Sequence, residues 1–194
     1  MQTLQTRQSV PYLLRGSLAG ARDCSCPCNP CDCNPCECPG ASRAPSWRLS
    51  LYRLAEGHFA KLSLLGHEML LLCLALAPEK EAADPKAWQE VILTEASVDP
   101  ETVLKLLEAI EEHLEALPAE VREQAPRPIR RAVYALPLVY QQHASTPRLS
   151  VNFQPAEARL LRAAEPEPMQ PPAPWSYNGP LAPRGSFVWQ SPLR

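Results

Sequence analysis

Seven of the eight cysteines in this 194-residue chain lie between residues 24 and 38. They are Cys24, Cys26, Cys28, Cys31, Cys33, Cys36 and Cys38. Within this run the unit Cys-Asn-Pro-Cys occurs twice, and its Asn-Pro pair favours a tight turn that brings both sulfur atoms to one side. Thiolates bind zinc and Cu(I) well, and a closed tetrahedral site needs four donors. Residues 24–40 are therefore predicted to bind Zn(II) or Cu(I), at one site or at two that share bridging sulfurs.

The density of Cys-x-Cys and Cys-x-x-Cys steps resembles that of metallothioneins, as a similarity of chemistry over one short segment. The resemblance implies a cluster whose ligands are thiolates. An iron–sulfur cluster is a lesser alternative, because the spacing matches neither common ferredoxin pattern. Three further interpretations stay open. They are a disulfide scaffold, thiol–disulfide exchange through Cys28/Cys31 or Cys33/Cys36, and a low-complexity repeat without selected chemistry.

The sequence contains no constellation typical of a catalytic site. His67-Glu68 begins the pattern of a zinc protease, but the position of the second histidine is occupied by Leu71. The other histidines are isolated in the sequence and are expected at the surface or in packing contacts. Cys73 lies in an apolar run and is predicted to be a small core residue. We therefore do not predict an enzyme.

Charge and hydropathy argue against two classes of partner. The formal net charge is -2 and there is no long basic run, so nucleic acid is not expected as a partner. The most apolar stretch, residues 62–77, is interrupted by Gly66, His67 and Glu68, so no membrane span is predicted. A cytoplasmic location is expected. Import into an organelle is an alternative, because residues 1–22 contain arginines and no acid, although Pro11 would interrupt a targeting helix.

The longest apolar periodicity lies in residues 46–143, and it predicts helices. The clearest start is Asp99-Pro100-Glu101, with an N-cap aspartate, a proline at the first helical position and an acid in the first turn. Apolar residues then recur at steps of four and three, at Val103, Leu107, Ile110, Leu114 and Leu117. We expect this helix to end before Pro118.

Other parts of the same region also suggest helices. Residues 68–77 are rich in Leu, Ala and Met, and Asp84-Pro85 could begin a helix that runs to about Thr94. Residues 128–143 have apolar side chains at helical spacing, with a break or kink expected at Pro137. Residues 47–65 fit either a hairpin or a helix, because their apolar side chains satisfy both periods.

Ten of the 23 prolines follow residue 144, so residues 144–194 are predicted to be extended and partly polyproline II. This stretch also carries aromatic side chains that a simple spacer would lack. They are Trp175, Tyr177, Phe187 and Trp189, and we expect them to bind a groove on a protein partner.

Taken together, these patterns predict a mainly α protein, a small antiparallel helical bundle flanked by an irregular cysteine-rich segment and an extended proline-rich tail. The expected organisation is a polar leader (1–23), a metal-binding segment (24–40), a helical domain (46–143) and the tail (144–194). The predicted function is non-enzymatic metal binding with a helical interaction domain. The alternatives are a structural or assembly subunit of a larger complex, held by its extended termini, and a thiol–disulfide redox protein.

Overall fold

The computed structural model describes residues 11–23, 46–59, 62–64, 68–76, 89–95, 97–115, 130–142, 146–162 and 172–191. In these ranges the chain forms strands and one helix. The strands are β1 (Tyr12–Arg22), β2 (Trp47–Phe59), β3 (Leu62–Ser63), β4 (Met69–Leu76), β5 (Gln89–Thr94), β6 (Arg130–Ala135), β7 (Val139–Gln141), β8 (Arg148–Phe153), β9 (Arg159–Arg162), β10 (Trp175–Pro180) and β11 (Ala182–Gln190). The helix is α1 (Pro100–Glu115).

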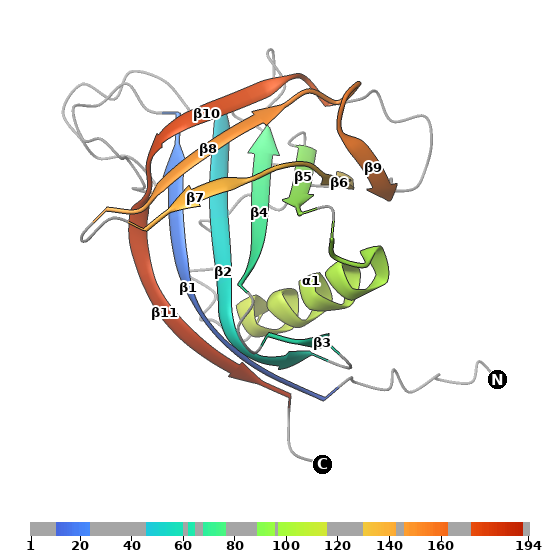
Figure 1. The fold of residues 1–194 in the computed structure, drawn as a ribbon, viewed down its shortest axis with the longest axis vertical. Coiled ribbons are helices and arrows are strands. Elements are labelled where there is room, and N and C mark those ends of the chain that lie inside the picture. Colours follow the sequence, from blue (N-terminus) through green and yellow to red (C-terminus); the bar gives the residue numbers. More distant parts are fainter. Residues whose placement is uncertain are drawn as a thin grey trace.

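The described strands form two sheets (Figure 1). The large sheet has the strand order β11-β1-β2-β4-β5-β6-β9, and β3 pairs with β2. Neighbouring strands in it are antiparallel except β5 and β6, which are parallel and between which α1 lies in the sequence. Because a parallel pair needs a crossover connection, α1 has a topological role as well as a packing role. The small sheet has the order β10-β8-β7.

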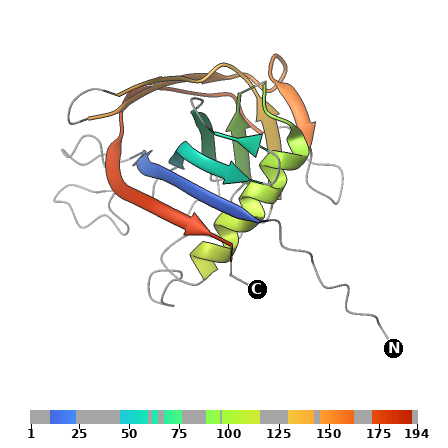
Figure 2. The same cartoon turned by 60° about the horizontal axis from the view of Figure 1, so that its bottom comes forward.

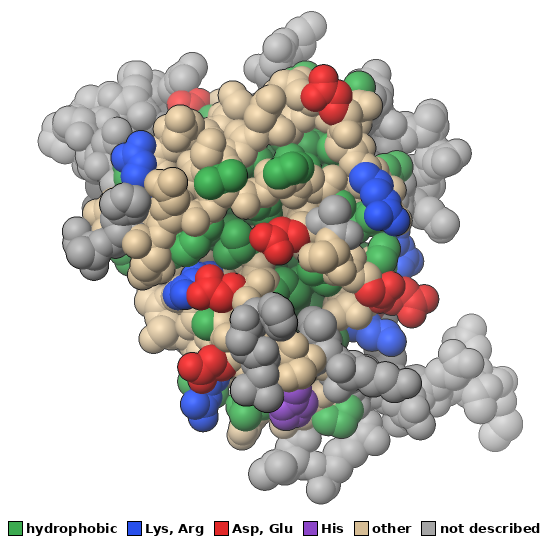
Figure 3. Space-filling view, viewed as in Figure 1, with side chains coloured by type: hydrophobic (Ala, Val, Ile, Leu, Met, Phe, Trp, Pro, Cys, Tyr) green, Lys and Arg blue, Asp and Glu red, His purple; other side chains and the backbone are tan. Residues whose placement is uncertain are grey.

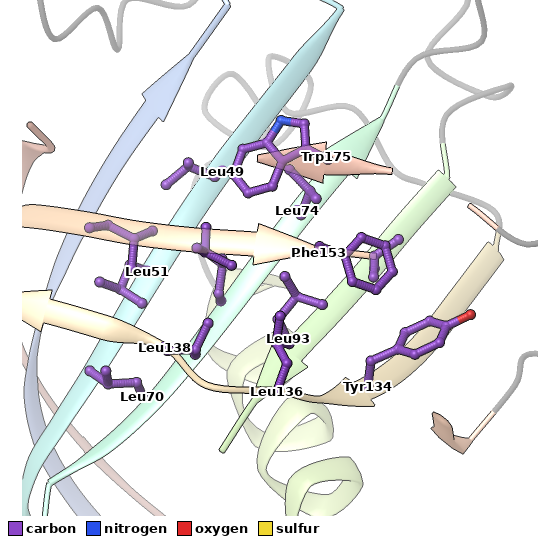
Figure 4. Close-up of a cluster of buried hydrophobic side chains, with 14 of the residues drawn as sticks. Leu49, Leu51, Leu70, Leu74, Leu93, Tyr134, Leu136, Leu138, Phe153 and Trp175 are labelled. Atoms are coloured by element: carbon purple, nitrogen blue, oxygen red, sulfur yellow. The ribbon is translucent and has the colours of Figure 1, made fainter. Parts of the chain in front are cut away.

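The large sheet is the middle of three layers. Figure 2 shows the small sheet arching over one side of it, with α1 on the other side. Leu72 and Leu74 of β4 pack toward the small sheet, against residues such as Phe153 and Trp175 (Figure 4). Leu71 of the same strand packs in a second core with side chains of α1. The large sheet is therefore covered on both faces by apolar side chains.

The predicted helical bundle is wrong. Residues 69–76 and 89–94, which were expected in helices, form β4 and β5, and residues 130–141 of the third expected helix contain β6 and β7. Leu71 and Leu72 are both fully buried, although consecutive side chains of a strand point to opposite faces. A strand covered on both faces is apolar at nearly every position, so its sequence has no period that distinguishes it from a buried helix.

The helix predicted after Asp99 is confirmed as α1. The carboxylate of Asp99 caps it, because Oδ2 accepts a hydrogen bond of 3.0 Å from the backbone N–H of Thr102. Val103, Leu107 and Ile110 are buried against the large sheet, as their spacing indicated. This element was predictable because its start signal and its apolar stripe are both local in the sequence. Its length and apolarity are too small for it to cross a membrane.

In the described part of residues 47–65 the chain forms strands, as the hairpin alternative predicts. β2 continues to Phe59, which pairs with Leu62 of β3. Gly57 lies inside β2 with φ 121°, and a Cβ atom there would stand 1.9 Å from the carbonyl oxygen of Leu13. The glycine thus lets β2 bend closely around β1 instead of ending the strand. The break expected at Pro137 is present, between β6 and β7.

The expected extended tail is also corrected, because residues 148–190 contain β8 to β11 and belong to both sheets. β11 pairs with β1, so a strand from the predicted leader lies beside a strand from the predicted tail. The prolines that the structure describes in this region stand near strand ends or on an edge strand, such as Pro180 and Pro183, where a missing N–H costs little. A high proline content is therefore not sufficient to predict that a segment is an extended tail.

Candidate metal centre and its anchor in the sheet

The seven clustered cysteines lie outside the described residues, so their predicted metal site stays a prediction. The structure does describe the two residues at which this segment joins the fold. β1 ends at Arg22 and β2 begins at Trp47, and Arg22 pairs with Arg48 in the antiparallel ladder. The backbone N–H of Asp23 donates a hydrogen bond of 3.1 Å to the carbonyl oxygen of Trp47. Segment 24–45 therefore connects two neighbouring strands, and the sheet holds its two ends side by side.

A side-chain contact closes this junction. The hydroxyl of Ser46 donates a hydrogen bond to the carboxylate of Asp23, directly beside the last backbone bond of the β1–β2 ladder. Neither residue was predicted to have a role. The sequence does indicate where β2 begins, because Trp47, Leu49 and Leu51 alternate with polar residues. It does not indicate which strand pairs with β2, and so it does not predict the contact between Asp23 and Ser46.

Aromatic side chains pack beside the junction on the face of the small sheet. The ring of Trp47 lies 5.4 Å from that of Trp175 and 5.5 Å from that of Tyr177, both in edge-to-face arrangements. Trp175 and Tyr177 stack on each other with 6.0 Å between centroids. Trp175 is only 8% exposed, and Figure 4 shows its indole nitrogen turned away from Leu49 and Leu74. This cluster fixes the first residue of β2 to the small sheet.

Arginine side chains gather near the junction on the other face of the large sheet. Arg22 is 7% exposed and stands next to the junction in β1, opposite Arg48 in β2. Arg184 of β11 donates a hydrogen bond of 2.7 Å from Nη1 to the hydroxyl of Ser50. Its guanidinium lies over Gly20, where an added Cβ would come within 2.7 Å of it. Acidic side chains share this end of the sheet, because Asp23 follows Arg22 and Glu90 lies in the same register row as Arg48, with Ala75 between them.

The aromatic residues expected to bind a partner are placed in the protein's own cores. Besides Trp175 and Tyr177, the rings of Phe187 and Trp189 stack at 4.0 Å on the α1 side of β11, and both contact Tyr52. Phe187 and Trp189 remain partly exposed. Trp175 is nearly buried, and the partner role predicted for these four aromatic residues stays a prediction.

Cys73 lies in β4 and packs partly buried in the core on the α1 side, as its apolar surroundings predicted. Nearby, burial above all, and then the charge of Cys73, raise the pKa of Tyr52 far above its ordinary value. The Tyr52 hydroxyl therefore stays protonated at any physiological pH, which suits a residue whose ring contributes to packing.

The glutamate of His67-Glu68 is engaged in an ion pair. The Nε of Arg53 donates a hydrogen bond of 2.9 Å to Oε2 of Glu68, and a second hydrogen bond joins the same two side chains. The hydrogen bonds from Arg53 lower the pKa of Glu68, so its carboxylate is charged at neutral pH. Figure 3 shows this face of the molecule with acidic and basic side chains interspersed, without a broad patch of one sign in the described part.

Within the described ranges, no group of three or more His, Cys, Asp or Glu side chains comes together to hold a metal ion. Comparisons of the chain with models of protein families, with curated proteins and with solved structures give no match. The function is therefore argued from the chemistry of the cysteines and from the way the sheet holds their segment.

Proposed function

We propose that this chain is a non-enzymatic metal-binding protein in which the cysteines of residues 24–38 bind Zn(II) or Cu(I). The β fold then serves as the carrier of that segment. The observation that carries the proposal is the placement of the thiol-rich segment between β1 and β2, with Asp23 and Ser46 joined at its base. Such a segment can close around a metal without rearranging either core.

The proposed site depends on the charge of its thiols. A metal site of four thiolates around Zn(II) carries a net negative charge, and thiols bind metals only after losing their protons. Positive charge nearby favours the anionic form of a thiol. Arg22, Arg48 and Arg184 lie at this end of the sheet together with the acidic residues Asp23 and Glu90. A reducing compartment such as the cytoplasm would keep the thiols available.

The proposal also predicts weak coupling between metal binding and folding. The cysteines lie within fifteen residues of one another in the sequence. The segment can therefore bind metal in the unfolded chain as well as in the folded one. A ligand that binds both states stabilises the folded state little. Metal loading should therefore matter for the segment's chemistry more than for the stability of the sheets.

The test is zinc uptake by the reduced full chain and by two variants. In the first variant Cys28, Cys31, Cys33 and Cys36 are all replaced by serine, which leaves three clustered thiols, too few for a closed site of four thiolates. In the second, matched variant only Cys73→Ser is made, which removes a thiol from the core and none from the segment. We expect the parent chain and Cys73→Ser to retain at least one zinc ion against a colorimetric chelator, and the quadruple variant to lose it.

Two results would contradict the proposal. Equal zinc retention by the quadruple variant and the parent chain would place the metal elsewhere. Failure of the reduced parent chain to take up either Zn(II) or Cu(I) would remove metal binding as the function.

A further inference from the structure

The two edges of the large sheet differ in how well they are protected against pairing with another strand. β9 forms one edge, is only four residues long, and has an arginine at each end, Arg159 and Arg162. Short length and charge are the features by which natural proteins keep an edge strand from pairing. β11 forms the other edge and is nine residues long. In the described part of the chain β11 pairs with β1 alone, and Figure 1 shows it as the outermost strand beside β1.

Only the first half of β11 is protected. Pro183 and Arg184 lie there, Gly185 has φ 127°, and the register with β1 shifts opposite this point. The second half, Ser186–Gln190, contains no charge, proline or glycine and pairs with β1 without interruption. At its centre Val188 is 63% exposed, more than Val139 and Leu160, the other large apolar side chains that are exposed in the described ranges. An uncharged and regular edge of this kind is a template for an added strand.

We propose that this half of β11 pairs with β11 of a second copy of the chain, in an antiparallel arrangement about a two-fold axis at Val188. Val188 then lies opposite its own copy. Phe187 lies opposite Trp189 of the other copy, and Ser186 lies opposite Gln190. The stacked rings of Phe187 and Trp189 lie on the α1 side of each β11, so the rings of the two copies become neighbours across the interface. Aromatic cross-strand pairs of this kind stabilise a sheet.

Among the residues that the structure places, the charge to consider in the self-pairing is Arg15 on the face of Val188. Arg15 is the register partner of Val188 in β1, and it is paired with Glu56 at 3.8 Å. In the dimer the two Arg15 residues are three strand spacings apart, roughly 14 Å. That separation exceeds the distance of about 8 Å over which physiological salt screens charges.

A second copy fits this edge better than an unrelated strand because the sequence from 186 to 190 is complementary to itself in the antiparallel direction. The pairing is isologous, so it uses up both β11 edges and closes at two chains. The remaining edges of the joined sheet are the two β9 strands, whose arginines discourage further growth. The inference is independent of the proposed metal site, which belongs to the β1–β2 connection.

The test is the mass in solution of the reduced full chain, measured by sedimentation with a chelator present so that metal bridges cannot hold two chains together. We expect the parent chain to have the mass of two chains. Val188→Lys places two ammonium groups opposite each other at the axis, and Val188→Glu does the same with carboxylates. Each variant alone should shift toward the monomer, with a dissociation constant about 10-fold higher, because the Val188 contact is lost and directly opposed like charges destabilise strand pairing. An equimolar mixture of the two variants should again have the mass of two chains.

The control is Val139→Lys, because Val139 is 53% exposed and lies on β7 at an edge of the small sheet. This variant should stay dimeric. A monomeric parent chain, loss of the dimer in Val139→Lys, or failure of the mixed variants to associate would each overturn the proposal. Amide hydrogen exchange of the parent chain gives a second readout without a substitution. Exchange at 186–190 should slow as the protein concentration rises, and exchange independent of concentration would contradict β11 pairing.

Discussion

Replacing residues 24–45 by the tripeptide Ser-Asn-Gly is expected to abolish metal binding while the β fold remains intact. The last paired residues of the junction are Arg22 with Arg48 and Asp23 with Trp47, so three residues suffice to continue the ladder by one pair and turn. Asn-Gly is the preferred sequence for a two-residue type I′ hairpin turn. The shorter connection lowers the entropy cost of closing the loop by about 1 to 2 kcal/mol. The Tm should therefore be unchanged or a few degrees higher.

Circular dichroism with thermal unfolding, together with metal analysis, measures both effects in one preparation. The matched control keeps residues 24–45 at their full length and changes the seven cysteines to serine. It should lose metal equally, but its Tm should stay at the value of the parent chain because the loop length is unchanged. If the shortened variant unfolds without cooperativity while the serine control unfolds cooperatively, segment 24–45 is needed for the stability of the sheets. Metal retained by the shortened variant would show that the cysteines are not the ligands.

Leu71→Ala and Leu72→Ala are each expected to lower the free energy of unfolding by about 2 to 5 kcal/mol, the cost typical of a buried leucine. The two residues are adjacent in β4 and both are fully buried, one in the core with α1 and the other in the core with the small sheet. Because the strand lies between two cores, both substitutions should lower the free energy of unfolding by a large amount. In an amphipathic helix one of two neighbouring residues would lie nearer to solvent, and its substitution would lower the free energy of unfolding less.

Urea unfolding followed by circular dichroism gives the two free energies, and Leu160→Ala is the exposed control. Leu160 is 51% exposed on β9, so its truncation should change the free energy of unfolding by less than about 0.5 kcal/mol. A near-neutral result for either Leu71→Ala or Leu72→Ala would contradict the three-layer arrangement. The double variant should cost close to the sum, because the two side chains lie on opposite faces and share few neighbours.

The features that sequence reasoning found were local. The Asp99 cap and the stripe beginning at Val103 lie within one helix, and Pro137 interrupts the chain where it stands. The thiol chemistry of residues 24–38 is predicted from residue type and spacing, and it stays a proposal because these residues lie outside the described part of the chain.

The features that it missed depend on residues distant in the chain. The run from Met69 to Leu76 is apolar because it has a core on each face, and nothing within the run reveals that. The pairing of Leu13 with Gln190 joins two stretches that are far apart in the sequence, and without it the prolines of residues 144–194 predict a tail. The junction at Asp23 and Ser46 exists only because β1 and β2 are neighbours. Long-range pairing of this kind leaves no local pattern in a single sequence.

Native mass spectrometry of the reduced full chain, loaded with Zn(II) or Cu(I) and then freed of excess metal, decides whether residues 24–38 bind a metal. We expect a mass increase equal to one or more whole metal ions minus the protons released by the bound thiols, because metal-bound cysteines are deprotonated. Under the proposal, the bound metal also protects cysteines of residues 24–38 from alkylation. A reduced chain that retains no metal ion, with all seven of these thiols alkylated as quickly with metal as without it, would contradict it.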